Sequence, residues 1–350
     1  MTPALCPVKT NTDLEAYRRL LRDIYAHDRH YTPHSEMLPC DGSAWLAYDG
    51  NTPVACCAAQ TQTANPNIGT IGFFESINHP PTAKVLLGHA VALLRSAGAQ
   101  RIIGPMNGDT WHAYRINAGP FEAAPFLKEP WNPPYYSALW EKAGFVRLES
   151  YGSFIVDDPA LAASNQLKYY RRCVQHGYTF VPITGSNYTS ILQTLHALST
   201  VIFSNNLFYT PIGYESFANL YATARPLLRH GLSWLSFLPN GSPAGYVFAY
   251  PDYADAVRAM RGRSDVFAKI RFLLGRHRAT RTCIKTLGVI PEARGSGLAM
   301  ALTHLAFANS ANLGYRQCLM CLMHSANASQ RLGGQADRPF RSYVLYDYQP

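Results

Sequence analysis

The chain has 350 residues, of which 47% are hydrophobic and 15% charged, and 31 Lys and Arg against 22 Asp and Glu give it a formal net charge of +9. This composition excludes low-complexity disorder, because a disordered chain has few apolar residues and many charges. At about 100 to 200 residues per domain, the length predicts two domains, each with its own core. No run approaches the ~20 apolar residues of a membrane span, and residues 1–10 lack a signal-peptide pattern, so we expect a cytoplasmic protein without a membrane span.

The first half of the chain predicts alternating helices and strands. A helix over 14–25 precedes the tripeptide Tyr31-Thr32-Pro33. A hairpin with its turn at 49–51 follows, because Asp-Gly-Asn between apolar runs is typical of a hairpin turn. A strand over 70–74, a helix over 83–97 and a strand over 101–104 come next. This order indicates an α/β fold with a mixed, mostly antiparallel sheet flanked by helices.

The second half repeats this order. A helix over 191–202 precedes Tyr209-Thr210-Pro211, and a second hairpin turns at 240–242. The strand 285–290, the helix 298–313 and the strand 316–323 then match the earlier strand, helix and strand. Such a duplication predicts two tandem copies of one fold. We expect the first copy over 1–156, a linker helix within 157–177 and the second copy over 178–350.

The positive charge is concentrated between residues 258 and 285. This segment holds one acid, Asp265, and nine basic side chains: Arg258, Arg261, Arg263, Lys269, Arg271, Arg276, Arg278, Arg281 and Lys285. Its apolar residues recur at helical spacing, so the segment predicts an amphipathic helix with a cationic face. Such a face attracts an anionic partner: phosphates, an acidic carrier protein, RNA such as tRNA, or a membrane surface. A solvated helix that keeps the protein soluble is the alternative interpretation.

The eight cysteines show no spacing typical of a disulfide framework. Cys318 and Cys321 form a C-x-x-C motif inside the apolar run 318–323, which predicts a buried strand. Residues three apart on a strand point to opposite faces, and no second Cys/His pair lies nearby. We therefore expect buried thiols and no metal site.

The stretch from Leu287 to Leu302 is the most specific part of the sequence. An apolar strand runs into a glycine-containing turn, and the turn opens an apolar helix. Glycines let a backbone approach a ligand closely, while the free N–H groups at a helix N-terminus bind anions such as a diphosphate. The turn lacks the features of a Rossmann fingerprint and of a P-loop. It consists of Arg294, Gly295, Ser296, Gly297, Leu298 and Ala299.

This turn resembles the signature Arg/Gln-x-x-Gly-x-Gly/Ala of the GNAT superfamily, the acyl-CoA-dependent N-acyltransferases. Arg294, Gly297 and Ala299 stand at its defined positions. The first half resembles the same fold through the stretch 131–136 and through Gly144-Phe145. The resemblance spans essentially the whole chain and implies a tandem, double-GNAT arrangement.

The resemblance implies that acetyl-CoA or another acyl-CoA binds the second half. The strand residues Leu287, Gly288 and Val289 would pair with the pantetheine arm, the turn 294–299 would hold the diphosphate, and Asn327 would contact the arm where two strands diverge. In the first half, the matching residues are 78–83, where two prolines replace N–H donors and glycine is missing. We therefore expect a degenerate first copy that shapes the substrate pocket.

The acid and the base of the reaction are harder to assign. Many family members have a Tyr seven residues after the Asn, and Gly334 stands at that position here. Candidates for a catalytic role are His324, Ser329, Tyr250 and Asp252, each with a structural role as the alternative. Direct attack by a well-positioned amine is a further alternative. Candidate pocket walls are Trp111, His112, Tyr136, Tyr209 and Tyr246, for which core packing is the alternative.

The leading hypothesis is an N-acyltransferase that moves an acetyl or longer acyl group from acyl-CoA to a small-molecule or amino-acid-like amine. One alternative takes the acyl group from an aminoacyl-tRNA or from a carrier protein bound at the basic segment. Another is a catalytically silent protein that binds acyl-CoA.

Overall fold

A computed structural model describes residues 2–33, 37–326 and 337–349. The chain forms two compact α/β units, one over Met1–Ser150 with Ser342–Pro350 and the other over Tyr151–Arg341. The expected boundaries differ from these. The predicted linker 157–177 belongs to the second unit, and the last nine residues, 342–350, belong to the first. None of the helices in the described ranges is long and apolar enough to cross a membrane.

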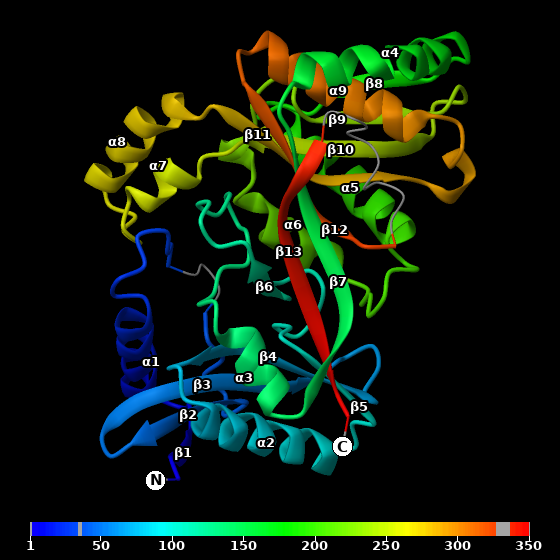
Figure 1. Ribbon diagram of the computed structural model, residues 1–350. Coiled ribbons are helices and arrows are strands. Elements are labelled where there is room, and N and C mark those ends of the chain that lie inside the picture. The colour runs from blue at the N-terminus through cyan, green and yellow to red at the C-terminus, as the bar shows by residue number, and fades with distance from the viewer. Residues whose placement is uncertain (1, 34–36, 327–336, 350) are drawn as a thin grey trace. The chain divides into compact units, whose positions relative to one another are not determined.

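The first unit is a mixed sheet with helices on both faces (Figure 1). Strands β1 to β4 are antiparallel neighbours in chain order, β5 is parallel to β4, and the end of β13 is antiparallel to both β5 and β6. Within the described residues its elements are β1 (Ala4–Pro7), α1 (Asn11–Ile24), β2 (Ala44–Asp49), β3 (Thr52–Thr61), β4 (Ile68–Ser76), α2 (Pro80–Ser96), β5 (Arg101–Gly104), β6 (Ile116–Gly119), α3 (Tyr136–Lys142) and parts of β7 (Phe145–Val156) and β13 (Asp337–Tyr348).

Alternation along β3 divides the core of this unit between the two faces. Ala55 and Cys57 join the cluster beneath α2, whereas Cys56 and Ala58 join the cluster beneath α1. Successive strand residues point to opposite faces, so a strand covered on both sides is apolar throughout. The continuous apolar run in β3 therefore reflects a sheet buried between two helical layers.

Helix α1 begins with a capping box. The Thr10 hydroxyl accepts a hydrogen bond from the Asp13 backbone N–H at 3.2 Å, and the Asp13 carboxylate accepts one from the Thr10 backbone N–H at 2.8 Å. We expect Thr10→Ala to lower the stability of the first unit by about 1 kcal/mol, or about 2 to 4 °C in melting temperature. Circular dichroism melts of the two chains measure this difference.

The cap also has a pH dependence. The backbone hydrogen bond from Lys9 is the largest cause that lowers the pKa of Asp13, followed by the hydrogen bond from the Thr10 side chain. Stabilisation by a group whose pKa is lowered on folding is present above its unfolded value and is lost as the pH falls through the folded value. The difference between wild type and Thr10→Ala should therefore shrink in acid, and an unchanged difference there would contradict this account.

The second unit repeats the same plan (Figure 1). Its strands lie in the order β7, β12, β11, β10, β9, β8, and among these described strands only the β11–β12 pair is parallel. Within the described residues its elements are α4 (Pro159–Gln175), β8 (Thr179–Pro182), α5 (Tyr188–Ile202), α6 (Tyr214–Ala222), η1 (Arg225–Leu227), β9 (Trp234–Phe237), β10 (Pro243–Pro251), α7 (Ala254–Arg258), α8 (Val266–Gly275), η2 (Arg276–Arg278), β11 (Arg281–Val289), η3 (Pro291–Ala293), α9 (Leu298–Asn312) and β12 (Gln317–His324).

The predicted linker helix is α4, and it packs along α9 in the second unit rather than joining two domains. The Thr303 hydroxyl donates a hydrogen bond to Gln166 Oε1 at 2.7 Å, and a ring nitrogen of His304 lies 2.8 Å from the Ala163 carbonyl oxygen. Gln166 is 2% exposed, so this polar contact is buried between the helices. Buried polar groups of this kind fix one register of two helices.

The predicted duplication is confirmed. The series β2, β3, β4, α2, β5 of the first unit recurs as β9, β10, β11, α9, β12 in the second. One connection differs between the copies. Residues 62–67 join β3 to β4, whereas α7, α8 and η2 are inserted between the matching strands β10 and β11.

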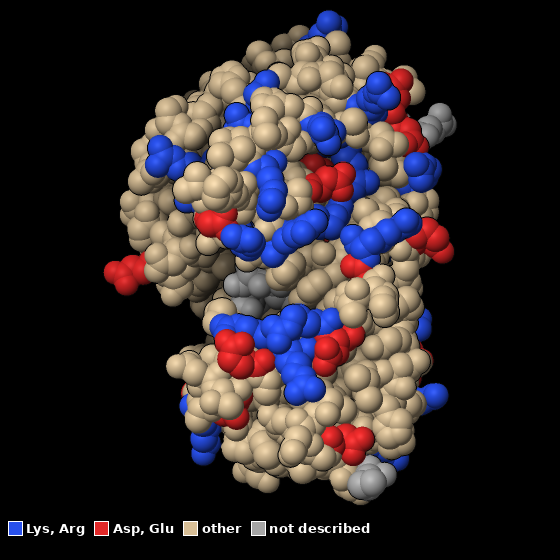
Figure 2. All heavy atoms as spheres, turned by 90° about the vertical axis from the view of Figure 1, so that its left-hand side faces the viewer, with Lys and Arg blue, Asp and Glu red and all other residues tan. Residues whose placement is uncertain are grey.

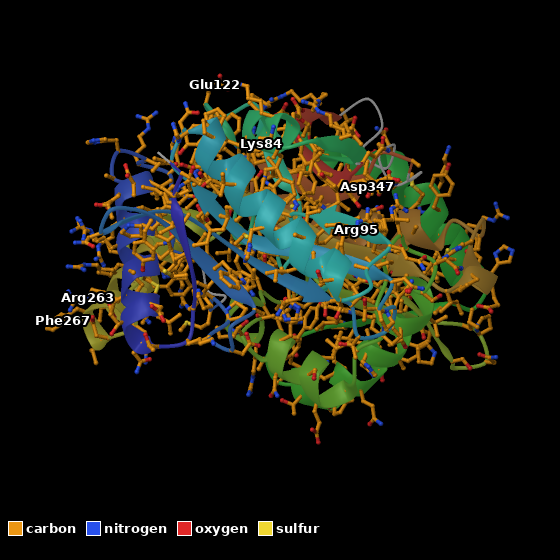
Figure 3. All side chains as sticks on the ribbon, turned by 90° about the horizontal axis from the view of Figure 1, so that it is seen from below. Lys84, Arg95, Glu122, Arg263, Phe267 and Asp347 are labelled. Carbon is orange, nitrogen blue, oxygen red and sulfur yellow. The ribbon has the colours of Figure 1, made fainter. Side chains whose placement is uncertain are left out.

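The predicted basic amphipathic helix is α8, inside this insertion. Figure 2 shows Lys and Arg side chains gathered over α7 and α8 in the upper half of the view. Figure 3 shows Arg263 and Phe267 at the outer edge, pointing away from the ribbon. Most of the basic side chains of the segment are exposed, but the prediction of a cationic helix face is wrong for α8, because its solvent-facing side carries the apolar residues Val266, Phe267, Ile270, Leu273 and Leu274.

Candidate functional site

The turn before α9 has the backbone that an anion-binding loop requires. Gly295 and Gly297 have φ angles of +79° and +91°, in the left-handed region that favours glycine. The Ser296 hydroxyl donates a hydrogen bond to the Ala293 carbonyl at 2.7 Å and accepts one from the Leu298 N–H at 3.2 Å. These internal bonds hold the turn against the first turn of α9, whose N–H groups have no intrahelical acceptors.

The two glycines have different surroundings. A Cβ atom at Gly297 would lie 2.9 Å from Tyr169 Cδ1 of α4, whereas a Cβ atom at Gly295 would meet nothing within 4 Å. Gly297 therefore allows a close contact between α4 and the start of α9. Gly295 leaves the outer side of the turn open, which is the side from which a ligand can approach.

Helix α4 also brings a cation to this turn. Lys168 Nζ lies 5.2 Å from the centroid of the Tyr169 ring, which itself contacts Gly297. The sequence analysis assigned neither residue to the site, because it treated α4 as a linker. The signal that could have found them is the run Lys-Tyr-Tyr-Arg-Arg at 168–172, which places three basic and two aromatic residues together near the end of a helix.

The strand that leads into the turn has an open edge. Within the described residues, strand β11 pairs with β12 from Arg281 to Ile284 only, but it pairs with β10 up to Val289. The two strands therefore diverge after Ile284. On the β10 side, Thr286 faces Phe248 and Ile284 faces Ala249, so Lys285 is the extra residue of a β-bulge. Bulges of this kind end a pairing and are frequent beside active sites.

The open edge presents alternate backbone groups. The Ile290 N–H donates to the Ala244 carbonyl on the β10 side at 2.9 Å. Because successive N–H groups of an antiparallel strand point to opposite edges, the N–H of Val289 points to the edge that β12 has left, as does that of Leu287. Gly288 faces β10 instead, and a Cβ atom there would lie 2.5 Å from Ile202 Cγ2 of α5.

The corresponding gap in the first unit is filled by the chain itself. Strands β4 and β5 diverge after the pair Thr70 and Ile103. The Met106 N–H then donates to the Ile71 carbonyl at 2.9 Å, and the Phe73 N–H donates to Asn107 Oδ1 at 2.8 Å. Helix α2 begins with two prolines, which have no N–H to offer. That the first copy is degenerate stays a prediction.

The predicted catalytic residues are only partly described. His324 is the half-buried last residue of β12, and its Nδ1 accepts a hydrogen bond from the Ala326 N–H at 3.2 Å. Its ring also packs edge-on against Tyr151 at 5.1 Å between centroids. Asn327, Ser329 and the position of the missing Tyr, Gly334, lie outside the described residues.

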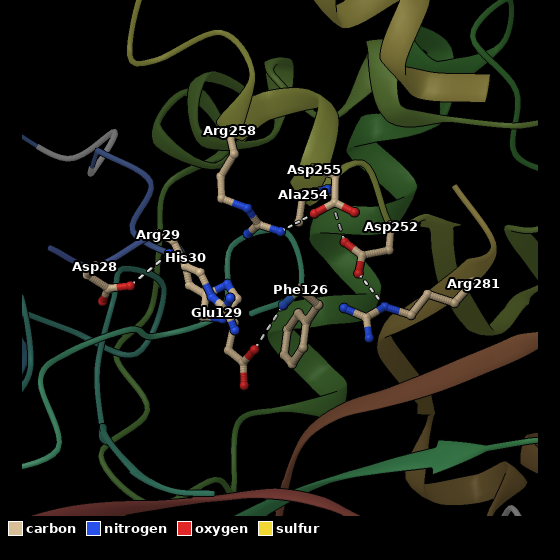
Figure 4. A network of polar contacts seen from close by, with 10 residues as sticks. All are labelled: Asp28, Arg29, His30, Phe126, Glu129, Asp252, Ala254, Asp255, Arg258 and Arg281. Carbon is tan, nitrogen blue, oxygen red and sulfur yellow. Dashed lines mark hydrogen bonds and ion pairs between the residues drawn. The ribbon is translucent and has the colours of Figure 1, made fainter. Parts of the chain in front are cut away.

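Asp252 and Tyr250 are both buried at the end of β10. Asp252 pairs with Arg281 at 2.7 Å, and its other oxygen accepts a hydrogen bond from the Ala254 N–H at 3.2 Å (Figure 4). Burial raises the pKa of the Tyr250 phenol well above its usual value. The ion pair joins the two residues at which the α7–α8 insertion leaves and rejoins the sheet. This geometry supports a structural role for Asp252.

The predicted pocket walls fall into both units. In the second, Tyr246 is 5% exposed and shares a hydrogen bond of 2.8 Å with Ser199, while Tyr209 is half-buried in the loop after α5. In the first, Tyr136 is 2% exposed. Its hydroxyl donates to Glu75 Oε2 at 2.6 Å and accepts from the Ser76 N–H at 2.9 Å. Tyr136 therefore belongs to a buried polar network in the core.

Trp111 and His112 lie in the loop between β5 and β6. The Asp109 carboxylate accepts hydrogen bonds from the Trp111 N–H at 2.8 Å and from the His112 N–H at 3.2 Å. Trp111 is half-buried and His112 exposed. Both side chains thus stand on a turn that Asp109 orders.

The sequence analysis missed a cavity in the first unit. It has a volume of about 450 Å³, and aromatic and charged side chains line it, among them Tyr25, Asp28, His30, Phe121 and Trp131. The Trp131 indole N–H donates to Asp28 Oδ2 at 2.7 Å. The residues come from α1 and from loops far apart in the sequence, which is why no local pattern indicated them.

The thiols of the C-x-x-C motif are buried. Cys318 is 0% and Cys321 is 6% exposed, and burial raises the pKa of Cys318 to about 12. Reactive thiols have lowered pKa values and partial exposure. The prediction of buried thiols at these positions is confirmed.

Comparison with known proteins identifies the fold. No family model matches the chain. Protein YghO of Escherichia coli K12 is 21% identical over 322 residues, which cover 87% of this chain and 82% of that protein. A GCN5-related N-acetyltransferase from Sphaerobacter thermophilus superposes with a TM-score of 0.53 at 13% identity, over 99% of this chain and 95% of the other.

A tandem GNAT protein from the clavulanic acid biosynthesis pathway also superposes with a TM-score of 0.53 at 13% identity, over 99% of both chains. The match includes both units. In the second unit, β11 diverges from β12 before the glycine turn. The resemblance inferred from the motif is confirmed at the level of structure. The chain has the tandem fold of the GNAT acetyltransferases.

Proposed function

We propose that this protein is an N-acyltransferase that transfers an acetyl or longer acyl group from acyl-CoA to the amine of a small molecule. The observation that carries the proposal is the continuous run from an unpaired strand edge at Leu287 and Val289 into the turn 294–297. A strand edge, an open turn and a helix N-terminus in this order fit the amides and the diphosphate of CoA. The GNAT fold supports acyl transfer in general.

The residues of the second unit fit such a ligand. The N–H groups of Leu287 and Val289 would pair with the pantetheine amides, and the N–H groups at the start of α9 would bind the diphosphate. Arg294 is exposed at the turn and would supply a positive charge. In the reaction, the amine nitrogen bonds to the thioester carbon, the C–S bond breaks, and the proton lost by the amine is taken up at the thiolate. His324 is the described candidate for moving that proton, because a histidine side chain is the group that most often transfers protons in catalysis.

Thermal unfolding with CoA tests the binding half of this proposal. At a hundred times its dissociation constant, CoA should stabilise the second unit by ~2.7 kcal/mol, which is several degrees in melting temperature. Arg294→Gln should reduce the shift, because it removes the charge beside the diphosphate. Arg316→Gln is the matched control, since Arg316 is equally exposed but lies beyond the other end of α9. No shift with CoA or with acyl-CoA would overturn the proposal.

Release of free thiol from acyl-CoA tests the catalytic half. Acyl-CoA thioesters of increasing length are offered with a panel of amines and amino acids, and thiol release above the rate without protein is measured. Transfer predicts release that depends on one class of amine. Stabilisation by acyl-CoA without any release would instead identify a silent acyl-CoA-binding protein.

We also propose the cytoplasm as the compartment. All eight cysteines are free thiols, six of them buried, and a reducing compartment keeps thiols in this state.

A further inference from the structure

The insertion of α7 and α8 between β10 and β11 is not needed to connect these strands. Antiparallel neighbours can be joined by a few residues, and the matching strands of the first unit are joined by residues 62–67. Helix α8 packs chiefly against α7 and η2, within the insertion itself. The insertion thus carries a surface that the sheet does not use.

The outer face of α8 is apolar. Ala268 is its buried residue, and Phe272 packs on Tyr253 at 5.6 Å between ring centroids. The remaining apolar side chains are exposed to solvent: Val266 by 68%, Phe267 by 70%, Ile270 by 46%, Leu273 by 47% and Leu274 by 71%. At 3.6 residues per turn these five lie in one stripe about 120° wide. Exposed apolar patches of this kind mark interaction sites.

Cations border this apolar stripe. By the same helical geometry, Lys269 lies along one border and Arg271 along the other. Further exposed cations precede and follow the helix: Arg261, Arg263, Arg276 and Arg278. Figure 2 shows this cluster of Lys and Arg over α7 and α8. Two acids, Asp255 and Asp265, lie nearby, and they pair with Arg258 and Arg263.

We propose that α8 docks this protein onto the surface of an anionic lipid membrane, with its apolar stripe in the boundary between headgroups and acyl chains. Helices that lie in this boundary combine an apolar face with flanking Lys and Arg, which attract anionic headgroups. Here Val266, Phe267 and Leu274 would enter the lipid, and Lys269 and Arg271 would remain at headgroup level. The inference concerns a surface outside the acyl-CoA site and stands independently of the proposed function.

The charge pattern favours a lipid surface over other partners. A second copy would bring two identical clusters of arginine together across a symmetric contact, and like charges repel. A nucleic acid would satisfy the cations, but its backbone offers no cover for five aliphatic and aromatic side chains. An anionic bilayer matches both the stripe and its borders.

Co-sedimentation with lipid vesicles tests the proposal on the full chain. The protein should pellet with vesicles of phosphatidylglycerol in phosphatidylcholine at low salt, and much less with phosphatidylcholine alone. Replacing three cations together, Lys269→Gln, Arg271→Gln and Arg276→Gln, should weaken binding about a hundredfold. High salt should weaken wild-type binding in the same direction, because it screens the charges.

A second variant tests the apolar stripe. Phe267→Ser with Leu274→Ser should weaken binding to the anionic vesicles at least about tenfold, because two large side chains no longer enter the lipid. The control is Leu161→Ser with Val174→Ser, which removes two apolar side chains of α4 that are 51% and 47% exposed and should leave binding unchanged. All of these side chains are exposed, so the variants should fold.

Four outcomes would overturn the proposal. The first is that the protein fails to pellet with anionic vesicles at low salt, and the second is that it binds neutral vesicles equally well. The third is that the serine pair on α8 leaves vesicle binding unchanged but abolishes a concentration-dependent dimer in sedimentation velocity, which would assign the stripe to a second copy. The fourth is that tRNA or an acidic carrier protein binds the wild type tightly and displaces it from the vesicles, with no dependence on Phe267 and Leu274.

Discussion

Gly295→Asp should abolish the stabilisation by CoA while leaving the unliganded protein close to wild type in stability. Asp tolerates the left-handed backbone at Gly295, and a Cβ atom there meets nothing within 4 Å. An acidic side chain at a helix N-terminus is also favourable on its own. Against a diphosphate, however, the new carboxylate costs up to about 4 kcal/mol at close range, nearly a thousandfold in affinity. Titration calorimetry and thermal shift with CoA measure both quantities.

The control for this variant is Gly314→Asp. Gly314 follows α9 at its other end, has a φ of +84° and also has open space around a Cβ atom. The substitution Gly314→Asp therefore imposes similar backbone strain at a position away from the turn 294–299, and it should leave CoA binding intact. Gly295→Asn separates charge from bulk, since it keeps the shape without the negative charge. If Gly295→Asp binds CoA as the wild type does, the diphosphate is not bound at this turn.

Asp252→Asn should lower the stability of the second unit by about 2 to 3 kcal/mol. Removing one partner of a buried ion pair costs about 3 to 5 kcal/mol, and the Arg281 side chain is 21% exposed, which reduces the loss. The pair closes the base of the insertion, where the Asp252 N–H also donates to the Arg281 carbonyl at 2.9 Å. Denaturant melts measure the loss, and hydrogen exchange should show faster opening of α7 and α8.

Asp255→Asn is the matched control three residues later. Asp255 pairs with Arg258, but its side chain is 91% exposed (Figure 4). Exposed ion pairs contribute ~0 to 1 kcal/mol, so this variant should stay within about 0.5 kcal/mol of wild type. Equal losses from the two variants would mean that burial of the Asp252 pair is not what stabilises the insertion.

The order of helices and strands could be predicted from the sequence because the two halves of the chain repeat it. The two hairpin turns depend on local chemistry, and both are present in the structure, between β2 and β3 and between β9 and β10. The glycine turn before α9 could be predicted for the same reason, since the left-handed backbone at 295 and 297 favours glycine.

Contacts between distant segments could not be predicted in this way. Strand β12 diverges from β11 after Ile284, but no residue of β11 indicates this divergence in the sequence. Lys285 is a bulge because of the register between β11 and β10, which is a contact between two strands. The packing of Tyr169 against Gly297 depends on the position of α4, which the sequence suggested as a linker. Residues 342–350 likewise belong to the first unit because they pair with β5 and β6, and the strand propensity of these residues does not indicate those partners.

Strand β13, which belongs to both units, determines when the sheet of the first unit can be completed during synthesis. Its residues Tyr343 to Asp347 pair with β5 and β6, more than two hundred positions upstream in the chain. Part of the hydrogen-bonding edge of the first unit therefore stays uncovered until residues 342–347 have been synthesised. Such long-range pairing slows folding and favours assistance by chaperones in the interval.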